Sequence, residues 1–290
     1  LTLLGTDGYT SLIRALSVIS TSGISGPENF RLDGAGFFGE IVIVLFLFIA
    51  LSHNIIKFFT KQVSGKKIVS DVEARLGLFI VLIATLLLSF KQLIQDNFSI
   101  ELIWGNFFTV FSFITTNGYV SAFWNPFSSA TDISYTTIIM MGLCLFGGGV
   151  ATTAGGIKLI RMSILFSAFS NETSKLLHPS SVTGANNQLK NLEISVFMAW
   201  IFFMLFIVSL AGLTIILGIF GMLFEDSIVL AVACLTTTGP IIEVIGLDKL
   251  LISDLSFIPK LTLAVGMVLG RLETVSYTHL RAHETRGNLV

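Results

Sequence analysis

The chain has 290 residues, of which 53% are hydrophobic and 12% charged. A soluble domain usually carries about twice that charged fraction, so the composition favours a protein embedded in lipid. The net charge of −1 argues against nucleic acid as a partner, because phosphate binding needs a clear excess of Lys and Arg. The two cysteines, Cys144 and Cys234, lie in apolar runs without metal-ligand neighbours, and we interpret both as packing residues.

Four apolar stretches approach the roughly 20 residues that a helix needs to cross a hydrocarbon core. They cover residues 37–56, 76–94, 194–220 and 257–272. A fifth stretch, 133–169, is long but interrupted by clustered glycines. Three further apolar stretches, 8–19, 104–114 and 226–235, are only about 11 residues long, and we expect them to be half-helices or re-entrant segments.

Each short stretch runs into a hydroxyl-rich turn that closes on glycine. The three turns are Ser20-Thr21-Ser22-Gly23, Thr115-Thr116-Asn117-Gly118 and Thr236-Thr237-Thr238-Gly239. One such turn alone is more often an ordinary helix end with a glycine cap. Three turns in matched surroundings, each after a short helix and before a spanning helix, indicate a repeated unit.

The repeat divides the chain into three units and a tail. Residues 1–67 form an incomplete unit, residues 68–178 and 179–273 form two nearly complete units, and residues 274–290 stand apart. Because the chain begins at Leu1 rather than Met, we expect it to be a fragment. The tail is polar without an amphipathic pattern, and we interpret it as a read-through artefact that is not native.

Lys and Arg are distributed unevenly between the connections. Nine lie in the 52 residues of segments 57–75 and 158–190, against five in the 122 residues of segments 1–36, 91–136 and 221–260. The positive-inside rule therefore places the first set in the cytoplasm and the three turns on the outer side. The outer segments also hold eleven acidic residues, which would concentrate cations there.

Hydroxyl-rich glycine turns suit a dehydrated monovalent cation. Backbone carbonyls and Thr or Ser hydroxyls replace its water shell without the trapping strength of carboxylates. Glycine lets the backbone direct carbonyls towards an axis, and each short helix points its negative C-terminal end at the ion path. We therefore predict that all the residues of the three turns bind the ion as a selectivity filter.

Three stretches resemble one family closely. They are residues 146–161, Leu177-His178-Pro179, and Thr237-Thr238-Gly239-Pro240 followed by Gly270-Arg271-Leu272-Glu273. These stretches and the repeat resemble the Trk/Ktr/HKT potassium transporter superfamily, most closely its bacterial TrkH type. The resemblance implies an all-α polytopic membrane protein with a pseudo-fourfold pore, in which the visible units match repeats two, three and four. It also implies potassium uptake across the inner (cytoplasmic) membrane, with potassium as substrate, no cofactor and no enzyme activity.

Glycines and threonines interrupt the long stretch 133–169. The residues are Gly147, Gly148, Gly149, Thr152, Thr153, Gly155 and Gly156. Glycine costs up to about 1 kcal/mol per helical position, so the segment should be a poor helix. The resemblance implies an intramembrane gate loop below the filter, with Arg271 facing the pore beside it.

Alternative interpretations of this region stay open. The glycines also fit a close-packing patch between helices, and Arg271 also fits a side chain that reaches the interface or pairs with Glu273. We expect Glu40, in the stretch 37–56, to lie near an interface. A phosphate-binding loop is excluded, because no Ser or Thr follows Lys158 and Ile157 separates that Lys from the glycines.

The resemblance also implies partners. These are membrane lipid, a second copy of the chain in a homodimer, and a cytoplasmic, TrkA-like nucleotide-binding regulatory subunit that docks on the basic inner connections. A sodium or mixed sodium and potassium transporter is the main alternative, because the first repeat, whose filter separates the two ions, is missing. A membrane enzyme or non-transporting subunit is more remote, since the spans lack clustered carboxylates or histidines.

Overall fold

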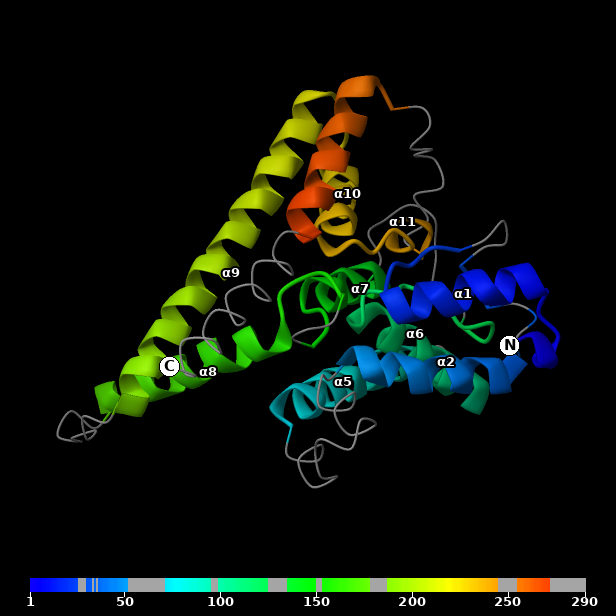
Figure 1. The fold of residues 1–290 in the computed structure, drawn as a ribbon, viewed down its shortest axis with the longest axis horizontal. Helices are drawn as coiled ribbons and strands as arrows, with labels where there is room; N and C mark the ends of the chain where they lie inside the picture. Colours follow the sequence, from blue (N-terminus) through cyan, green and yellow to red (C-terminus); the bar gives the residue numbers. More distant parts are fainter. Residues whose placement is uncertain are drawn as a thin grey trace, which may run out of the picture.

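The computed structural model describes residues 1–25, 30–32, 34, 36–51, 71–94, 99–124, 135–149, 153–177, 187–244 and 255–271. The elements in chain order are η1 (Thr2–Leu4), α1 (Gly8–Ser20), α2 (Gly36–Leu51), α5 (Val72–Ile94), α6 (Ile100–Ile114), α7 (Tyr135–Leu145), α8 (Leu159–Leu177), α9 (Asn187–Ile219), α10 (Phe224–Thr236) and α11 (Ile241–Val244). A further helix covers residues 257–271 (Figure 1). Within these residues the fold is all-α, with a single isolated bridge between Arg31 and Val120.

Short helices alternate with long ones in the predicted order. α1, α6 and α10 have 13, 15 and 13 residues, too few to cross a membrane. α5 and α9 have 23 and 33 residues, and each packs on the short helix that follows it in the chain, as Figure 1 shows for α9 and α10. The three predicted half-helices and these two spans are confirmed, although the boundaries of the repeated units stay a prediction.

The predicted break in the stretch 133–169 is also confirmed. α7 ends at Leu145 and α8 begins at Leu159, and the described residues between them are not helical. Gly148 and Gly156 have φ values of 58° and 71°, a left-handed conformation that glycine adopts without a steric penalty. The glycine cluster therefore ends one helix and separates it from the next.

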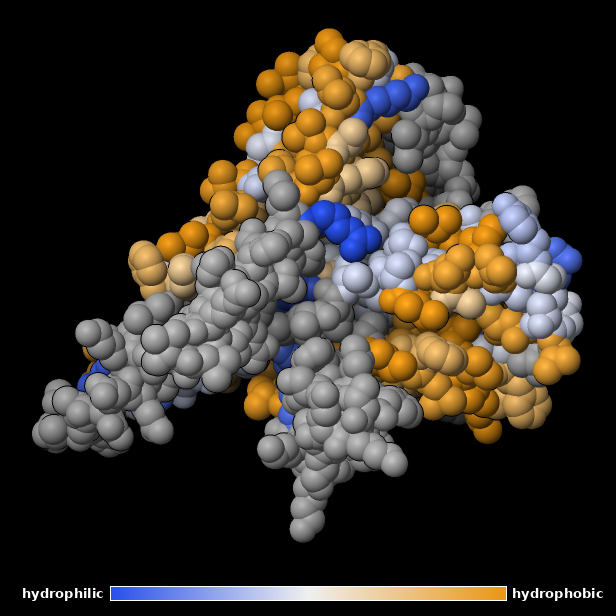
Figure 2. Space-filling view, viewed as in Figure 1, coloured by the Kyte–Doolittle hydropathy of each residue, from blue (hydrophilic) through white to orange (hydrophobic). Residues whose placement is uncertain are grey.

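Large apolar side chains cover the outside of the molecule. On α5, Phe79, Leu86 and Phe90 are at least 60% exposed. Apolar residues form broad patches on the face that Figure 2 shows, over α1, α2 and the upper part of α9. Soluble proteins rarely expose contiguous apolar patches of this extent, whereas lipid solvates them. Two of the described helices, Val72–Ile94 and Ser195–Ile219, are long and apolar enough to cross a membrane.

Two of the half-helices, α6 and α10, are enclosed by other helices. α6 is buried continuously from Phe108 to Ile114, in a core cluster shared with α2, α5 and α7. α10 is buried from Val229 to Thr236 and packs against Leu213 of α9. A polar turn at the end of such a helix is therefore screened from lipid by other parts of the protein, the condition under which irregular backbone is tolerated at membrane depth.

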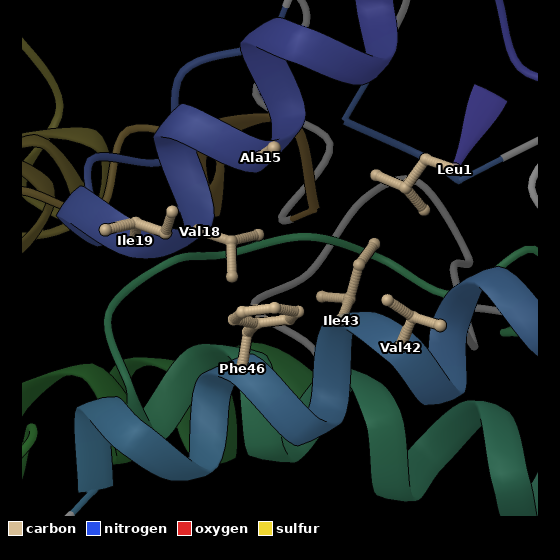
Figure 3. A pocket seen from close by; sticks show the side chains of 7 residues that line it. All are labelled: Leu1, Ala15, Val18, Ile19, Val42, Ile43 and Phe46. Atoms are coloured by element: carbon tan, nitrogen blue, oxygen red, sulfur yellow. The ribbon is translucent and has the colours of Figure 1, made fainter. Parts of the chain in front are cut away.

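α1 is the most open of the half-helices. Its apolar face consists of Tyr9, Leu12, Leu16 and Ile19, which are 59–69% exposed. A cavity of about 190 Å³ lies between α1 and α2, with Ala15, Val18 and Ile19 on one side and Val42, Ile43 and Phe46 on the other (Figure 3). The apolar face of α1 is thus less completely covered than those of α6 and α10.

Candidate functional site: three converging turns and a glycine-rich loop

All three turns end their helices with the same backbone geometry. The second residue of each turn, Thr21, Thr116 or Thr237, has a positive φ of 46°, 56° or 55°. The amide of the third residue donates to the carbonyl five residues earlier; the pairs are Ser22–Ser17, Asn117–Ser112 and Thr238–Ala233, at 3.0–3.1 Å. This is the hydrogen-bond pattern of a Schellman closure.

Threonine in this conformation is strained. A left-handed conformation costs an L-residue about 1–2 kcal/mol, and a β-branched residue there is a true outlier. Elsewhere in the described residues, positive φ is confined to glycine. The alternative of ordinary glycine caps is therefore wrong, because threonine takes the left-handed position and the glycine lies two residues beyond it. Repeated strain of this kind is typical of functional sites.

The hydroxyl of the first residue in each turn makes the same hydrogen bond. Ser20, Thr115 and Thr236 donate to the carbonyl oxygens of Leu16, Phe111 and Val232, four residues earlier, at 2.9, 3.0 and 2.8 Å. The Ser20 and Thr236 hydroxyls also lie 3.0 and 3.1 Å from the Ser22 and Thr238 hydroxyls. The first hydroxyl of each turn is therefore bonded back to its own helix end.

The three turns meet in space although 95 and 121 residues separate them. A Cβ atom on Gly23 would lie 2.5 Å from the Asn117 carbonyl oxygen and 3.1 Å from Pro240. A Cβ atom on Gly118 would lie 2.9 Å from Pro240 and 3.1 Å from Thr238. The C-terminal ends of α1, α6 and α10, each with about half a negative charge, consequently converge on one region.

Gly239 differs from the other two glycines. Gly23 and Gly118 have φ values of 60° and 79°, whereas Gly239 has no positive φ and a Cβ atom there would have nothing within 4 Å. Pro240 follows Gly239, and a residue before proline is biased towards extended backbone. The sequence motif therefore repeats more closely than the backbone does.

The glycine-rich loop lies against all three turns. The Thr153 hydroxyl is 2.6 Å from the Thr21 hydroxyl, and the Gly155 amide donates to the Thr116 hydroxyl at 2.9 Å. Gly155 also touches the backbone of Thr236 so closely that a Cβ atom would overlap the carbonyl oxygen. Because these contacts involve the helix-end residues and not Gly23 or Gly118, the loop covers the helix side of the turns.

Two basic side chains donate hydrogen bonds to the glycine-rich loop. Arg271 donates from Nη1 to the Thr153 carbonyl oxygen at 2.8 Å, and the buried ammonium of Lys158 donates to the Ala154 carbonyl oxygen. The carboxylate of Glu73 is buried beside Gly149 and close enough to Lys158 to interact with its charge. The loop is thus tied to the helix over 257–271 and to α5.

The structure brings together most of the predicted site residues. All the filter residues are described, as are the gate residues Gly147, Gly148, Gly149, Thr153, Gly155, Gly156 and Arg271. Thr152 lies outside the described residues. Ser20 is exposed, and Ser22 and Thr237 are partly buried, whereas Thr115, Thr116, Asn117, Thr236 and Thr238 are fully buried. The sequence thus identifies the right segments but not the depth of each side chain.

Sequence reasoning missed two buried charged residues beside the turns. Arg14, in the middle of α1, is 1% exposed and donates to the Arg31 carbonyl oxygen at 3.3 Å. Glu40 is 0% exposed and accepts hydrogen bonds from three groups, and its position near an interface stays a prediction. In both cases the signal was a lone charge within an apolar helix, where an ionisable residue is expensive and usually functional.

A sequence profile of the TrkH family, described as a cation transport protein, matches residues 42–288. The chain belongs to this family. The matched range extends into residues 274–290, which lie outside the described part of the chain; that they are not native stays a prediction. TrkH membership makes this chain part of a transporter family rather than an enzyme family and confirms the predicted superfamily.

Individual relatives agree with the TrkH assignment. The chain is 25% identical over 281 residues to the Trk system potassium uptake protein TrkG of Escherichia coli (strain K12), and 26% identical over 285 residues to the TrkH protein of the same strain. Each alignment covers 93% of this chain and 55% of the relative, so the chain spans about half the length of these relatives. The crystal structure of the potassium transporter TrkH from Vibrio parahaemolyticus has the same fold, with a TM-score of 0.77 at 22% identity over 96% of this chain and 59% of that one.

Proposed function

We propose that this chain forms part of a potassium uptake transporter of the cytoplasmic membrane, with the three turns as its selectivity filter. The observation that carries the proposal is the meeting of three similar turns at the ends of three half-helices, two of which, α6 and α10, are largely buried. The names of the relatives, which are potassium uptake proteins, support potassium as the substrate. Potassium is the cargo, and no cofactor enters the proposal.

In this proposal the turns bind the ion through oxygen. Backbone carbonyls beyond Thr21, Thr116 and Thr237 replace water around the ion, and the left-handed threonines give these carbonyls their direction. The converging helix ends make the region negative without a carboxylate that would trap the ion. The outward flanks are acidic, which raises the local concentration of cations at the entrance.

The glycine-rich loop is the gate in this proposal. It contacts the helix side of every turn through Thr153 and Gly155, so an ion leaving the filter inward would meet it. The Arg271 guanidinium places positive charge beside the loop, which opposes a cation in the closed state. Moving the loop requires breaking these hydrogen bonds and the close backbone contacts of Gly149 and Gly155.

A complete pore needs more than this chain supplies. We propose that a fourth filter unit completes the ring and packs against α1. The exposed apolar face of α1 and the cavity between α1 and α2 support this position (Figure 3). In this proposal the transporter is a homodimer that binds a cytoplasmic nucleotide-binding subunit. That subunit docks on the basic connections 57–75 and 158–190. The filter glycines Gly23, Gly118 and Gly239 favour potassium in this proposal, whereas the family's marker for sodium, a Ser at the filter glycine of the first repeat, lies in the unit that this chain does not include.

Complementation tests the proposed function. The complete gene around this chain is expressed in a bacterium that lacks its potassium uptake systems, and growth is measured at low external potassium. We expect growth with the wild-type gene and none with Gly118→Asp, whose side chain would collide with Pro240 in the filter. Growth with the Gly118→Asp variant at wild-type protein levels would contradict the filter assignment, and absence of potassium uptake by the wild type would contradict the function.

A further inference from the structure

We infer that Glu40 is a positioning residue that fixes the outer end of the filter turn 115–118 and thereby sets ion selectivity without touching the ion. The inference rests on the proposed filter and extends it to a carboxyl group in a different unit of the repeat. Glu40 lies in the first turns of α2, and its side chain is completely buried. Its own unit carries the turn 20–23, whereas its hydrogen bonds reach the next unit.

Three donors surround the Glu40 carboxylate. Oε1 accepts the Ser121 hydroxyl at 2.7 Å and the Ala122 amide at 2.8 Å, and Oε2 accepts the Trp104 indole N–H at 2.7 Å. An ionised carboxylate is an acceptor-only group, and its hydrogen bonds are shorter and stronger than those between neutral groups. Burial of such a group is tolerated only with this degree of satisfaction, so the arrangement is specific for a carboxylate.

These hydrogen bonds hold the segment that leaves the filter. Ser121 lies three residues after Gly118, and the Trp124 amide donates to the Ser121 carbonyl oxygen at 3.2 Å to close a turn. The Ser121 hydroxyl, which donates to Glu40, also accepts the Phe123 amide at 3.1 Å. This turn packs directly on α6, since a Cβ atom on Gly105 would lie 2.8 Å from the Phe123 carbonyl carbon.

The same segment is bonded to the preceding unit along its length. Val120 exchanges two backbone hydrogen bonds with that unit, to Phe30 and from Leu32, at 3.2 and 3.0 Å. The Tyr119 hydroxyl donates to the Ile24 carbonyl oxygen at 2.8 Å, immediately after the first filter turn. These hydrogen bonds and those of Glu40 together hold the segment 119–124 against the preceding unit. Losing one of the Glu40 hydrogen bonds therefore shifts the two adjacent filter turns relative to each other. Discrimination between potassium and sodium depends on the number and placement of the filter oxygens that coordinate the ion.

Glu40→Gln tests the inference with little change in shape. The amide oxygen can keep the bonds from Ser121 and Ala122, but the amide NH₂ then faces the indole N–H of Trp104, donor against donor. Trp104→Phe removes that donor while keeping an aromatic ring against Phe37 and Phe107, whose centroids lie 4.8 and 5.8 Å away. The double variant therefore relieves the conflict that the Gln variant creates.

The measurement is uptake of potassium and sodium by the complete transporter in proteoliposomes, at matched protein amounts. We expect Glu40→Gln to lower the ratio of potassium to sodium uptake about tenfold and to raise the KM for potassium with a smaller change in maximal rate. The double variant should lie closer to the wild type than Glu40→Gln does, which a general loss of stability would not produce.

Gln92→Leu is the matched control. Gln92 is buried, and its side-chain hydrogen bonds go to Asn106, which lies two residues after Trp104 on α6, rather than to the segment 119–124. It should lower the amount of folded protein and leave the uptake ratio unchanged. An unchanged ratio and KM in Glu40→Gln, or a double variant no closer to the wild type, would overturn the inference while the proposed function stands. A wild-type protein that imports no potassium would overturn the function itself.

Discussion

At the residue scale, the three threonines with positive φ are the feature that separates these turns from ordinary helix ends. Each forgoes about 1–2 kcal/mol by adopting a conformation that glycine would take freely. A turn under selection for stability alone would place glycine there. A threonine stands there instead, and in two of the three turns its hydroxyl is hydrogen-bonded to the glycine-rich loop, which links the strain to the contact between the turns and the loop.

Gly118 and Gly239 offer a matched pair for a test at this scale. Gly118→Ala must place Cβ 2.9 Å from Pro240 with a φ of 79°, whereas Gly239→Ala meets nothing within 4 Å and keeps an allowed φ. Overpacking and left-handed strain together cost about 2–5 kcal/mol. We expect potassium uptake per transporter to fall at least about tenfold in Gly118→Ala and less than about twofold in Gly239→Ala.

Initial rates of rubidium or potassium uptake, divided by the amount of transporter in the membrane, measure this difference. Gly23→Ala should resemble Gly118→Ala, since its Cβ would approach the Asn117 carbonyl oxygen to 2.5 Å. Equal loss of uptake in the Gly118→Ala and Gly239→Ala variants would show that the motif, rather than its backbone geometry, decides function.

At the scale of elements, the sequence predicted where helices begin and break but not how they are braced. Half-length apolar runs followed by Thr and Gly were sufficient for α1, α6 and α10, because length and composition are local properties. The meeting of Glu40 with Ser121, 81 residues later, depends on tertiary packing, and a single sequence carries no signal for such a pair. The difference between Gly118 and Gly239 was likewise invisible in the motif.

The loop between α7 and α8 must move for the proposed gate to open. Gly155→Ala would drive a Cβ atom into the Thr236 backbone and push the loop away from the filter. Gly142→Ala, on α7 of the same segment, has nothing within 4 Å and adds a better helix former. If the contact at Gly155 stabilises the closed state, losing about 1.4 kcal/mol of it raises the open population about tenfold.

Flux through purified transporter without its regulatory subunit measures this effect. We expect Gly155→Ala to raise unregulated potassium flux about tenfold and Gly142→Ala to leave it within about twofold of the wild type. Deleting residues 147–156 should likewise leave transport poorly regulated. A lower or unchanged flux in Gly155→Ala, in protein that keeps its selectivity, would contradict the assignment of the loop as a gate.

At the scale of the whole molecule, orientation follows from charge rather than from any single contact. The excess of Lys and Arg in segments 57–75 and 158–190 predicts that these segments lie on the inner side. Composition therefore predicted a membrane protein from the sequence alone, whereas the orientation that charge indicates stays a prediction. The relative placement of the units required the structure, because only their packing shows that the three turns converge.

Cysteine labelling tests this orientation directly. Glu101, exposed near the start of α6, belongs to the predicted outer side, and Ser174, exposed near the end of α8, belongs to the inner side. Cys144 and Cys234 are buried, so neither should react in the folded protein. We expect a membrane-impermeant maleimide added to intact cells to label Glu101→Cys but to label Ser174→Cys only after permeabilisation, with the parent protein as background. The reverse pattern would place the filter turns on the cytoplasmic side, and the proposed roles of filter and gate along the direction of uptake would be inverted.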